Sequence, residues 1–158
     1  MKTEIVYLNK NWGELTTYMS LDTVNESGAV ALAKVVKNGR LLRFLVRELV
    51  IPTDADYLER SPDQISFTPE FMESNFQRCE ANGLHLVNIH SHPFSKRGSF
   101  SFIDKREGSN TKGPYVQKWV PNTEQAFMVV GSDPERLDAC FWSLSEHRLM
   151  PVVVVKIM

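Results

Sequence analysis

Cysteine and histidine are both scarce in this chain of 158 residues, which contains two cysteines and four histidines. Cys79 and Cys140 lie far apart in the sequence, so they form neither a disulfide framework nor a paired-cysteine zinc clamp. We expect both to be reduced, mostly buried thiols of a cytosolic protein. Because histidines are few, two that stand close together in the sequence are more informative about a functional site.

Long apolar runs and an excess of one charge are missing as well. No run reaches the length of a transmembrane helix, and the first four residues are too polar to open a signal peptide. The formal net charge of -1 argues against a general nucleic-acid binder, which would be strongly basic. No internal repeat or low-complexity linker is present. We therefore expect one cytoplasmic domain over residues 1–158, without a membrane or nucleic-acid partner.

Hydrophobic patterning predicts a chain in which strands alternate with two helices. Trp12, Leu15 and Met19 recur at helical spacing and predict a short first helix. A second helix is predicted to begin at 68–70, where a hydroxyl, a proline and an acid follow one another, and to end at 82–83. Alternating or continuous apolar residues predict strands at 4–8, 28–36, 41–51, 84–92, 126–131, 137–144 and 151–157.

The connections between these elements differ in what they predict. Asn38-Gly39 favours a tight hairpin between two strands. Residues 53–67 contain Pro62 and are predicted to form a polar connection. Residues 93–122 form the longest irregular stretch, and such stretches commonly carry function. Met72, Phe76 and Cys79 are predicted to form the buried stripe of the second helix.

Two of the four histidines stand one residue apart, in His90-Ser91-His92-Pro93. Alternate residues of a strand share a face, so both imidazoles can bind one metal ion. Asp104 can return from the following loop as a third ligand. Two neutral imidazoles and one carboxylate leave bound Zn²⁺ with a net positive charge and an open fourth position. Such a site lowers the pKa of a bound water, which is what a hydrolase needs.

Each of these residues also has a structural interpretation. Ser101-x-x-Asp104 matches the capping box of a helix, and this is compatible with a ligand role, because a capped helix start holds Asp104 rigidly. His85 falls on the opposite strand face from the pair, and His147 falls in a predicted turn. We interpret His85 and His147 as ordinary polar residues and not as ligands.

Together these residues resemble the JAMM/MPN+ metalloprotease family, also called the JAB domain. Its motif is an upstream glutamate, then H-[ST]-H-P, a short loop and S-x-x-D. Here His90-Ser91-His92-Pro93 is followed by Ser101 and Asp104, with eight residues between His92 and Ser101 where the commoner pattern has seven. The resemblance implies an α/β class and a single-domain MPN/JAB fold, which is cytidine-deaminase-like, with a mixed curved β-sheet flanked by helices.

The resemblance also implies a catalytic glutamate, for which Glu14, Glu26 and Glu48 are the candidates. Glu26 precedes a small apolar strand and a hairpin, as in the family, whereas Glu14 lies in the predicted first helix and Glu48 in mid-strand. Without the zinc motif, Glu26 would be a solvated turn residue. With it, Glu26 is expected to accept and return the proton of the attacking water, and Ser101 to donate to the oxyanion.

The substrates implied by the family are ubiquitin or ubiquitin-like proteins, cut after their C-terminal Gly-Gly. Residues 50–57 and 67–71 look similar to bacterial JAB proteins found beside E1-like and E2-like enzymes, including those of antiviral defence operons. Three alternatives remain open: processing of a sulfur carrier, a phage-tail JAB peptidase, and a non-catalytic MPN scaffold. Gene neighbours would separate defence from biosynthesis, and a second peptidase domain would favour the phage type. A scaffold would lack the ligand set.

Overall fold

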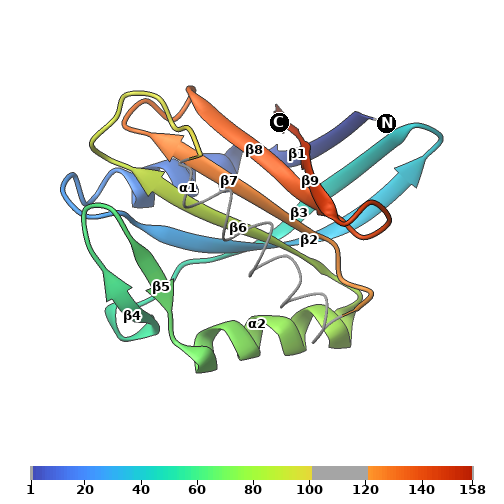
Figure 1. Cartoon of the computed structure of the whole chain (residues 1–158), viewed down its shortest axis with the longest axis horizontal. Coiled ribbons are helices and arrows are strands. Elements are labelled where there is room, and N and C mark those ends of the chain that lie inside the picture. The colour runs from blue at the N-terminus through green and yellow to red at the C-terminus, as the bar shows by residue number, and fades with distance from the viewer. Residues whose placement is uncertain (1, 101–120, 158) are drawn as a thin grey trace.

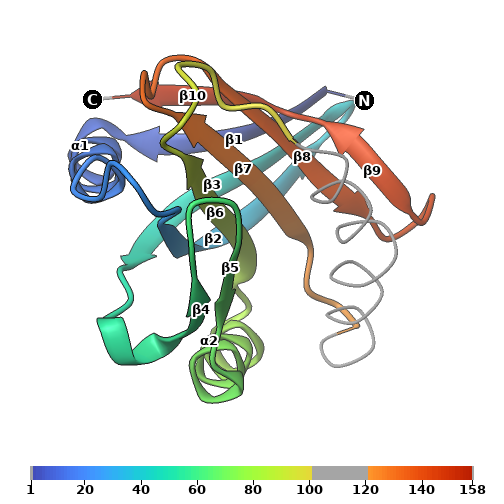
Figure 2. The same ribbon diagram turned by 60° about the vertical axis from the view of Figure 1, so that its left-hand side comes forward.

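The computed structural model describes residues 2–100 and 121–157, which form one large curled β-sheet, a separate β-hairpin and two α-helices (Figures 1 and 2). A short 3-10 helix, η1, also precedes the hairpin. In chain order the elements are β1 (Lys2–Leu8), α1 (Asn9–Met19), β2 (Gly28–Asn38), β3 (Leu41–Val50), η1 (Asp54–Asp56), β4 (Tyr57–Arg60), β5 (Ile65–Phe67), α2 (Pro69–Asn82), β6 (His85–His92), β7 (Gln125–Gly131), β8 (Leu137–Ser143), β9 (Arg148–Pro151) and β10 (Val153–Ile157).

The large sheet is mixed, and its strand order is β10-β1-β3-β2-β6-β7-β8-β9. Strand β1 runs parallel to both β10 and β3, and β6 runs parallel to β7, whereas the remaining neighbours are antiparallel. Strand β6, which carries the histidine pair, is therefore paired on both sides, while β10 and β9 form the two edges. Strands β4 and β5 pair only with each other in the described structure.

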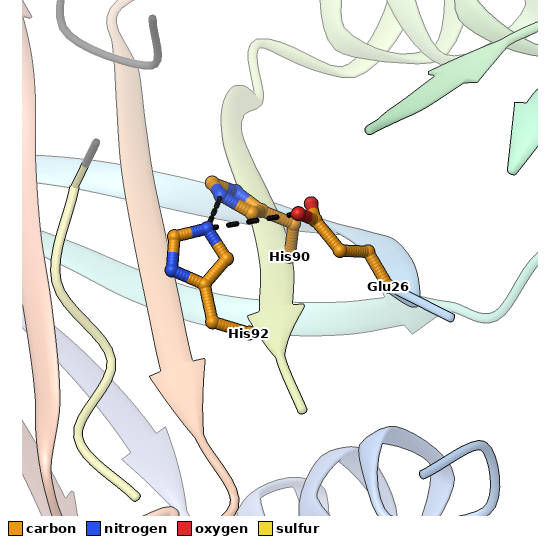
Figure 3. Close-up of side chains that lie close together, drawn as sticks. All are labelled: Glu26, His90 and His92. Carbon is orange, nitrogen blue, oxygen red and sulfur yellow. Dashed lines mark hydrogen bonds and ion pairs between the residues drawn. The ribbon is translucent and has the colours of Figure 1, made fainter. Parts of the chain in front are cut away.

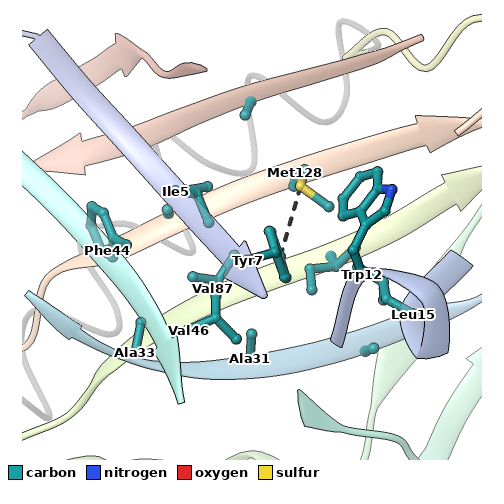
Figure 4. Packing of buried hydrophobic residues seen from close by; sticks show 14 of the residues in the cluster. Ile5, Tyr7, Trp12, Leu15, Ala31, Ala33, Phe44, Val46, Val87 and Met128 are labelled. Atoms are coloured by element: carbon teal, nitrogen blue, oxygen red, sulfur yellow. Dashed lines mark hydrogen bonds between the residues drawn. The ribbon is translucent and has the colours of Figure 1, made fainter. Parts of the chain in front are cut away.

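The main core lies on the concave face of the large sheet, where α1 packs against it (Figure 4). Tyr7 and Trp12 meet edge to face at 5.3 Å between ring centroids. Strand β2 contributes three alanines to this face, and its pairing with β3 is interrupted by a bulge at Leu32/Ala33. Small side chains and a bulge both allow a sheet to bend tightly. The sheet thus folds around its own apolar side chains.

A smaller core lies on the opposite face, under α2. It joins Val30 and Leu32 of β2 and Leu86 of β6, which are even-numbered residues of the two strands, to Phe71 and Cys79 of the helix. The helix begins as predicted, with the Thr68 hydroxyl accepting from the backbone N–H of Phe71, and ends at Gly83 in the left-handed conformation. The even residues of β6 include His90 and His92, so the histidine pair shares this face with α2.

The predicted α/β fold, an MPN/JAB sheet flanked by helices, is wrong for this chain. The described structure is mostly β, with an eight-stranded sheet curled into a half-barrel and only two α-helices, each covering part of one face. The physical reason is that strands supply most of the core themselves: Ile5, Phe44 and Phe141 meet across the curl.

Several predicted elements are confirmed and three are corrected. All seven predicted strands and both helices are present. Residues 53–67, predicted as a polar connection, instead form η1 and the β4–β5 hairpin, and the strand β9 was not predicted. The buried stripe of α2 is shifted, because Phe71 and Asn75 are buried with Cys79 while Met72 and Phe76 are only half-buried.

The environments of the two cysteines bear on whether either thiol is reactive. Neither cysteine forms a disulfide, Cys79 being buried and Cys140 partly exposed. Burial raises the pKa of the Cys79 thiol to about 11. This thiol is therefore protonated at neutral pH and is a poor nucleophile.

Within residues 2–100 and 121–157, no helix has the length and apolar character needed to cross a membrane.

Candidate metal centre

His90 and His92 lie at the C-terminal end of β6 and point to the same side of the sheet (Figure 3). Their Nε2 atoms are 3.2 Å apart. Two nitrogens bound to one tetrahedral zinc at the usual bond length lie about 3.3 Å apart. The two imidazoles are therefore already spaced as ligands of a single ion. The prediction that alternate strand positions would place them together is confirmed.

Glu26 completes a group of three residues around this point. Its Oε2 atom is 3.9 Å from Nε2 of His92, and the ligand atoms of Glu26, His90 and His92 all lie within 4.8 Å of one another. Glu26 is 4% exposed and His92 is 6% exposed, whereas His90 is half-buried. No other group of three histidine, cysteine or acidic side chains in the described ranges is gathered this closely.

Glu26 reaches the histidines because β2 begins directly beside the end of β6. The register pairs Gly28 with His90. One residue earlier, the Ser27 amide donates to the Ser91 hydroxyl at 2.8 Å, and the Ser91 amide donates to the Ser27 carbonyl at 2.9 Å. This double link extends the β2–β6 pairing to the residue that follows Glu26. The carboxylate is thereby brought to the histidine-bearing face.

The β4–β5 hairpin holds Glu26 from the other side. The Glu26 amide donates to the Ser61 carbonyl at 2.9 Å, and the Glu26 carbonyl accepts from Nε of Arg60 at 2.9 Å. The Tyr57 hydroxyl accepts from the Gly28 amide at 3.0 Å and lies 3.1 Å from the Gly28 carbonyl, to which it donates. The peptide groups around Glu26 are therefore bonded on both sides, by β6 and by the hairpin.

Gly28 is required for this close approach of the hairpin. A Cβ atom at position 28 would lie 2.4 Å from Cδ1 of Ile65 and 2.7 Å from Cζ of Phe67. Phe67 in turn contacts Phe71 of α2 with ring centroids 4.7 Å apart. The hairpin is thus packed between the start of β2 and the start of α2. A side chain at position 28 would push it away from Glu26.

The segment after β6 is fixed to the end of β7 by backbone contact. A Cβ atom at Gly98 would lie 2.5 Å from the Val129 carbonyl oxygen, so only glycine fits there. The amide of Gly98 also donates to the Arg136 carbonyl at 2.7 Å. Within this segment the ring of Phe94 stacks on His92, with centroids 5.1 Å apart and an interplanar angle of 24°. Phe94 is 67% exposed and therefore forms a surface directly beside the histidine pair.

The predicted site residues are thus only partly placed by the structure. Glu26, His90 and His92 come together, while Ser101 and Asp104 lie outside the described residues. The competing Glu48 lies on β3 and forms an ion pair with Arg78, whose hydrogen bond lowers the pKa of that carboxyl. The other competitor, Glu14, is an exposed residue of α1.

The two remaining histidines lie away from the group. His85 accepts a hydrogen bond from the backbone amide of Glu124 through Nδ1, at 2.7 Å. His147 occupies the turn between β8 and β9 with a positive φ of 53°. Their interpretation as ordinary polar residues agrees with these positions.

The donor set of the group fits a zinc ion. Two imidazole nitrogens and a carboxylate oxygen are the ligand types that zinc binds, and the spacing of the nitrogens matches one tetrahedral ion. A possible metal-binding triad is therefore present. In this triad Glu26 is close enough to act either as a ligand or as a neighbour of the ligands.

Sequence reasoning missed the residues that surround the triad. Arg60 and Tyr57 contact the backbone around Glu26, and Phe94 covers His92. The alternation of Tyr57, Glu59 and the later Ile65 and Phe67 was a weak strand signal that Pro62 and the polar residues obscured. Phe94 was readable only as the residue after Pro93.

Comparisons with known proteins support the fold alone. No family model and no curated protein matches the chain. The solution structure of protein DSY2949 from Desulfitobacterium hafniense is similar, with a TM-score of 0.60 and 16% identity over 96% of this chain and 92% of that one. A solution structure from Salinibacter ruber has a TM-score of 0.50 and 16% identity over 99% of this chain and 91% of that one. The likeness to these proteins is therefore one of overall fold.

Proposed function

We propose that this chain is a zinc-dependent peptidase or isopeptidase that cleaves after the C-terminal Gly-Gly of a ubiquitin-like protein. The observation that carries the proposal is the 3.2 Å spacing of the two Nε2 atoms beside the buried Glu26 carboxylate. The sequence pattern of the JAMM/MPN+ family supplies the reaction class. Its remaining residues, Ser101 and Asp104, belong to the proposal as oxyanion donor and third zinc ligand.

The proposed mechanism uses each residue for one task. His90, His92 and Asp104 would hold the zinc, which when bound polarises the scissile carbonyl and makes water more acidic. Glu26 accepts a proton from the attacking water as its oxygen bonds to the carbonyl carbon. The same carboxyl then gives that proton to the leaving amine nitrogen as the C–N bond breaks. Ser101 donates a hydrogen bond to the carbonyl oxygen as negative charge develops on it.

A Gly-Gly tail suits the surroundings of the triad. Strand β6 is paired on both sides, so an extended tail has no edge to join there. Strands β4 and β5 each have one edge without a partner in the described structure, and their hairpin contacts Glu26 through Arg60 and Ser61. An extended tail could join the open edge of β4 or of β5 by main-chain hydrogen bonds. Glycine at the scissile position lets the backbone approach the half-buried His90 and the buried His92.

The partners and compartment are part of the same proposal. Ubiquitin-like proteins, their conjugates and E1-like and E2-like enzymes are the expected partners, in a bacterial antiviral system. Neither cysteine forms a disulfide, and Cys79 is buried, which suits a reducing cytoplasm. The location is therefore proposed as cytoplasmic.

The proposal is tested with ubiquitin-like proteins fused through their C-terminal Gly-Gly to a reporter protein. Ubiquitin and bacterial ubiquitin-like proteins serve as the panel, and casein serves as the unfolded control. We expect one or more of the Gly-Gly fusions to be cleaved at that bond and casein to be spared. The matched fusion with the penultimate Gly→Leu should be cleaved poorly. Equal cleavage of both fusions, or cleavage of casein alone, would leave a general metallopeptidase. Zinc binding without any cleavage would favour a non-catalytic scaffold.

A further inference from the structure

The side chain of Arg60 donates hydrogen bonds to two neighbouring residues, Glu26 and Ser27. Its Nε donates to the Glu26 carbonyl at 2.9 Å, and its Nη2 donates to the Ser27 hydroxyl at 2.6 Å. These are two donors of one planar guanidinium. A guanidinium that donates twice fixes both the position and the orientation of what it binds.

Arg60 is itself held in place by contacts with Tyr57, Asp22 and Asp54. Its guanidinium carbon lies 4.7 Å from the centre of the Tyr57 ring, and Nη2 lies 3.6 Å from Oδ2 of Asp22. Asp22 also accepts from the backbone amides of Val24 and Asn25, which shapes the loop that leads to Glu26. These backbone hydrogen bonds lower the pKa of the Asp22 carboxyl. The Arg60 side chain therefore ties the hairpin, the loop before Glu26 and the start of β2 together.

The start of β2 needs this support because β3 does not reach it. The first β2–β3 pair is Val30 with Val50, whereas β6 pairs with β2 from Gly28 onward. On the side of β3, the polar groups of residues 26–28 are met instead by Arg60, Ser61 and Tyr57. The backbone that carries the Glu26 carboxylate is thus fixed on that side by the hairpin.

We propose that Arg60 is a positioning residue for the Glu26 carboxylate. This inference deepens the proposed function and rests on it, because that function makes Glu26 the base of the reaction. Arg60 holds the carbonyl of the residue whose side chain moves the proton. A misplacement of about 1 Å at a reacting group lowers turnover by about 100-fold. The loss of Arg60 therefore affects the rate of the chemical step more than the binding of a tail.

Kinetics with a cleavable Gly-Gly fusion test this role. Arg60→Ala is expected to lower kcat by about 10- to 100-fold with little change in KM and with zinc retained. Arg60→Lys keeps the charge but cannot donate twice in one plane, so it should recover only part of the loss. Arg148→Ala is the matched control, because Arg148 is an exposed residue of β9 that pairs with Glu146.

The double variant Arg60→Ala/Glu26→Gln separates positioning from a general structural role. If Arg60 acts through Glu26, the double variant should turn over no more slowly than Glu26→Gln alone. Losses that multiply would overturn the inference. So would the loss of zinc or of folding in both Arg60→Ala and Arg60→Lys, because that would make Arg60 part of the scaffold.

Amide hydrogen exchange gives a second readout that needs no substrate. The Glu26 amide, bonded to the Ser61 carbonyl, should exchange about 10-fold faster in Arg60→Ala than in the wild type. The amide of Val30, within the middle of the sheet, should be unchanged. Unchanged exchange at Glu26 would overturn the inference. If the wild type cleaves no Gly-Gly fusion, the proposed function fails. The exchange measurement still shows whether Arg60 holds the backbone of Glu26 in place.

Discussion

The Oε2 atom of Glu26 lies 3.9 Å from Nε2 of His92, and both side chains are almost fully buried. A carboxylate in this position can take a proton from a water at the histidine pair. We therefore expect Glu26→Gln to retain zinc and to lose turnover by about 100-fold or more. Zinc content and cleavage of a Gly-Gly fusion check the two halves of this prediction.

Glu48→Gln is the control for the glutamate assignment. Glu48 lies on β3 and is paired with Arg78, away from the histidines. This variant should cleave at the wild-type rate. Normal cleavage by Glu26→Gln together with an inactive Glu48→Gln would show that the wrong glutamate was assigned. Loss of zinc in Glu26→Gln would make Glu26 a ligand instead of a base.

Metal content is the most direct test of the histidine pair. The purified protein should carry about one zinc per chain, and a chelator should abolish its activity. His90→Ala, His92→Ala and Asp104→Asn should each lose most of the metal while the fold persists. Ser101→Ala should keep the metal and cleave more slowly.

The control for the metal measurements is His147→Asn. Its position is an exposed turn with positive φ, which asparagine tolerates. Full zinc in the double variant His90→Ala/His92→Ala would refute the ligand assignment.

The spacing of the histidines was predictable from sequence because it depends on one strand only. Alternation fixes His90 and His92 on one face whatever the rest of the chain does. The meeting of Glu26 with them depends on the register between β2 and β6, which pairs Gly28 with His90. Nothing local in the sequence fixes that register. Glu26 was found through the family motif alone.

The fold class could not be predicted because it depends on how the strands curl. Most strands and both helices were predictable, yet the same elements can form a helix-flanked sheet or a half-barrel. Alanines in β2 and the bulge at Leu32/Ala33 permit the curl, and no simple pattern marks them. The hairpin was missed because Pro62 and the polar residues around it are typical of a connection. Its strands are short and half-buried, so their alternation is weak.

Gly28→Ala tests whether the hairpin must lie against β2. The new Cβ would meet Cδ1 of Ile65 and Cζ of Phe67 at distances that require movement. We expect a loss of about 1–3 kcal/mol in the free energy of unfolding, as for other overpacked sites, together with slower turnover. Adding Ile65→Val removes the nearest atom and should recover part of both. Denaturant unfolding and cleavage assays measure these effects.

Gly13→Ala is the matched control for that variant. Gly13 lies in α1, and a Cβ there would have no atom within 4 Å. Alanine favours the helix over glycine by about 1 kcal/mol, so this variant should be slightly more stable and fully active. A Gly28→Ala protein as stable and active as Gly13→Ala would show that the hairpin can shift without consequence for Glu26.

Glu124 provides a pH-dependent test of a buried carboxyl at the other end of β6. It is 7% exposed, and its Oε2 has no hydrogen-bond partner in the described structure, although Lys37 lies 3.5 Å from Oε1. Burial raises the pKa of Glu124, an effect that Lys37 only partly offsets. The native state therefore binds this proton more tightly than the unfolded chain does. Its contribution to stability is greatest below the ordinary glutamate pKa of about 4.3 and is lost as the pH rises through the folded value.

The variant Glu124→Gln keeps the size of the side chain and removes its titration. The free energy of unfolding of the wild type should therefore fall relative to this variant as the pH is raised from about 4 to 7. Glu48→Gln should show the opposite sign, because the hydrogen bond from Arg78 lowers the pKa of Glu48. There the wild type should gain relative to its variant as the pH rises from the lowered folded pKa to just above the ordinary glutamate pKa of about 4.3, with little further change up to pH 7. Denaturant unfolding of the three proteins at several pH values measures both differences, and equal slopes for the two variants would contradict the assigned environments.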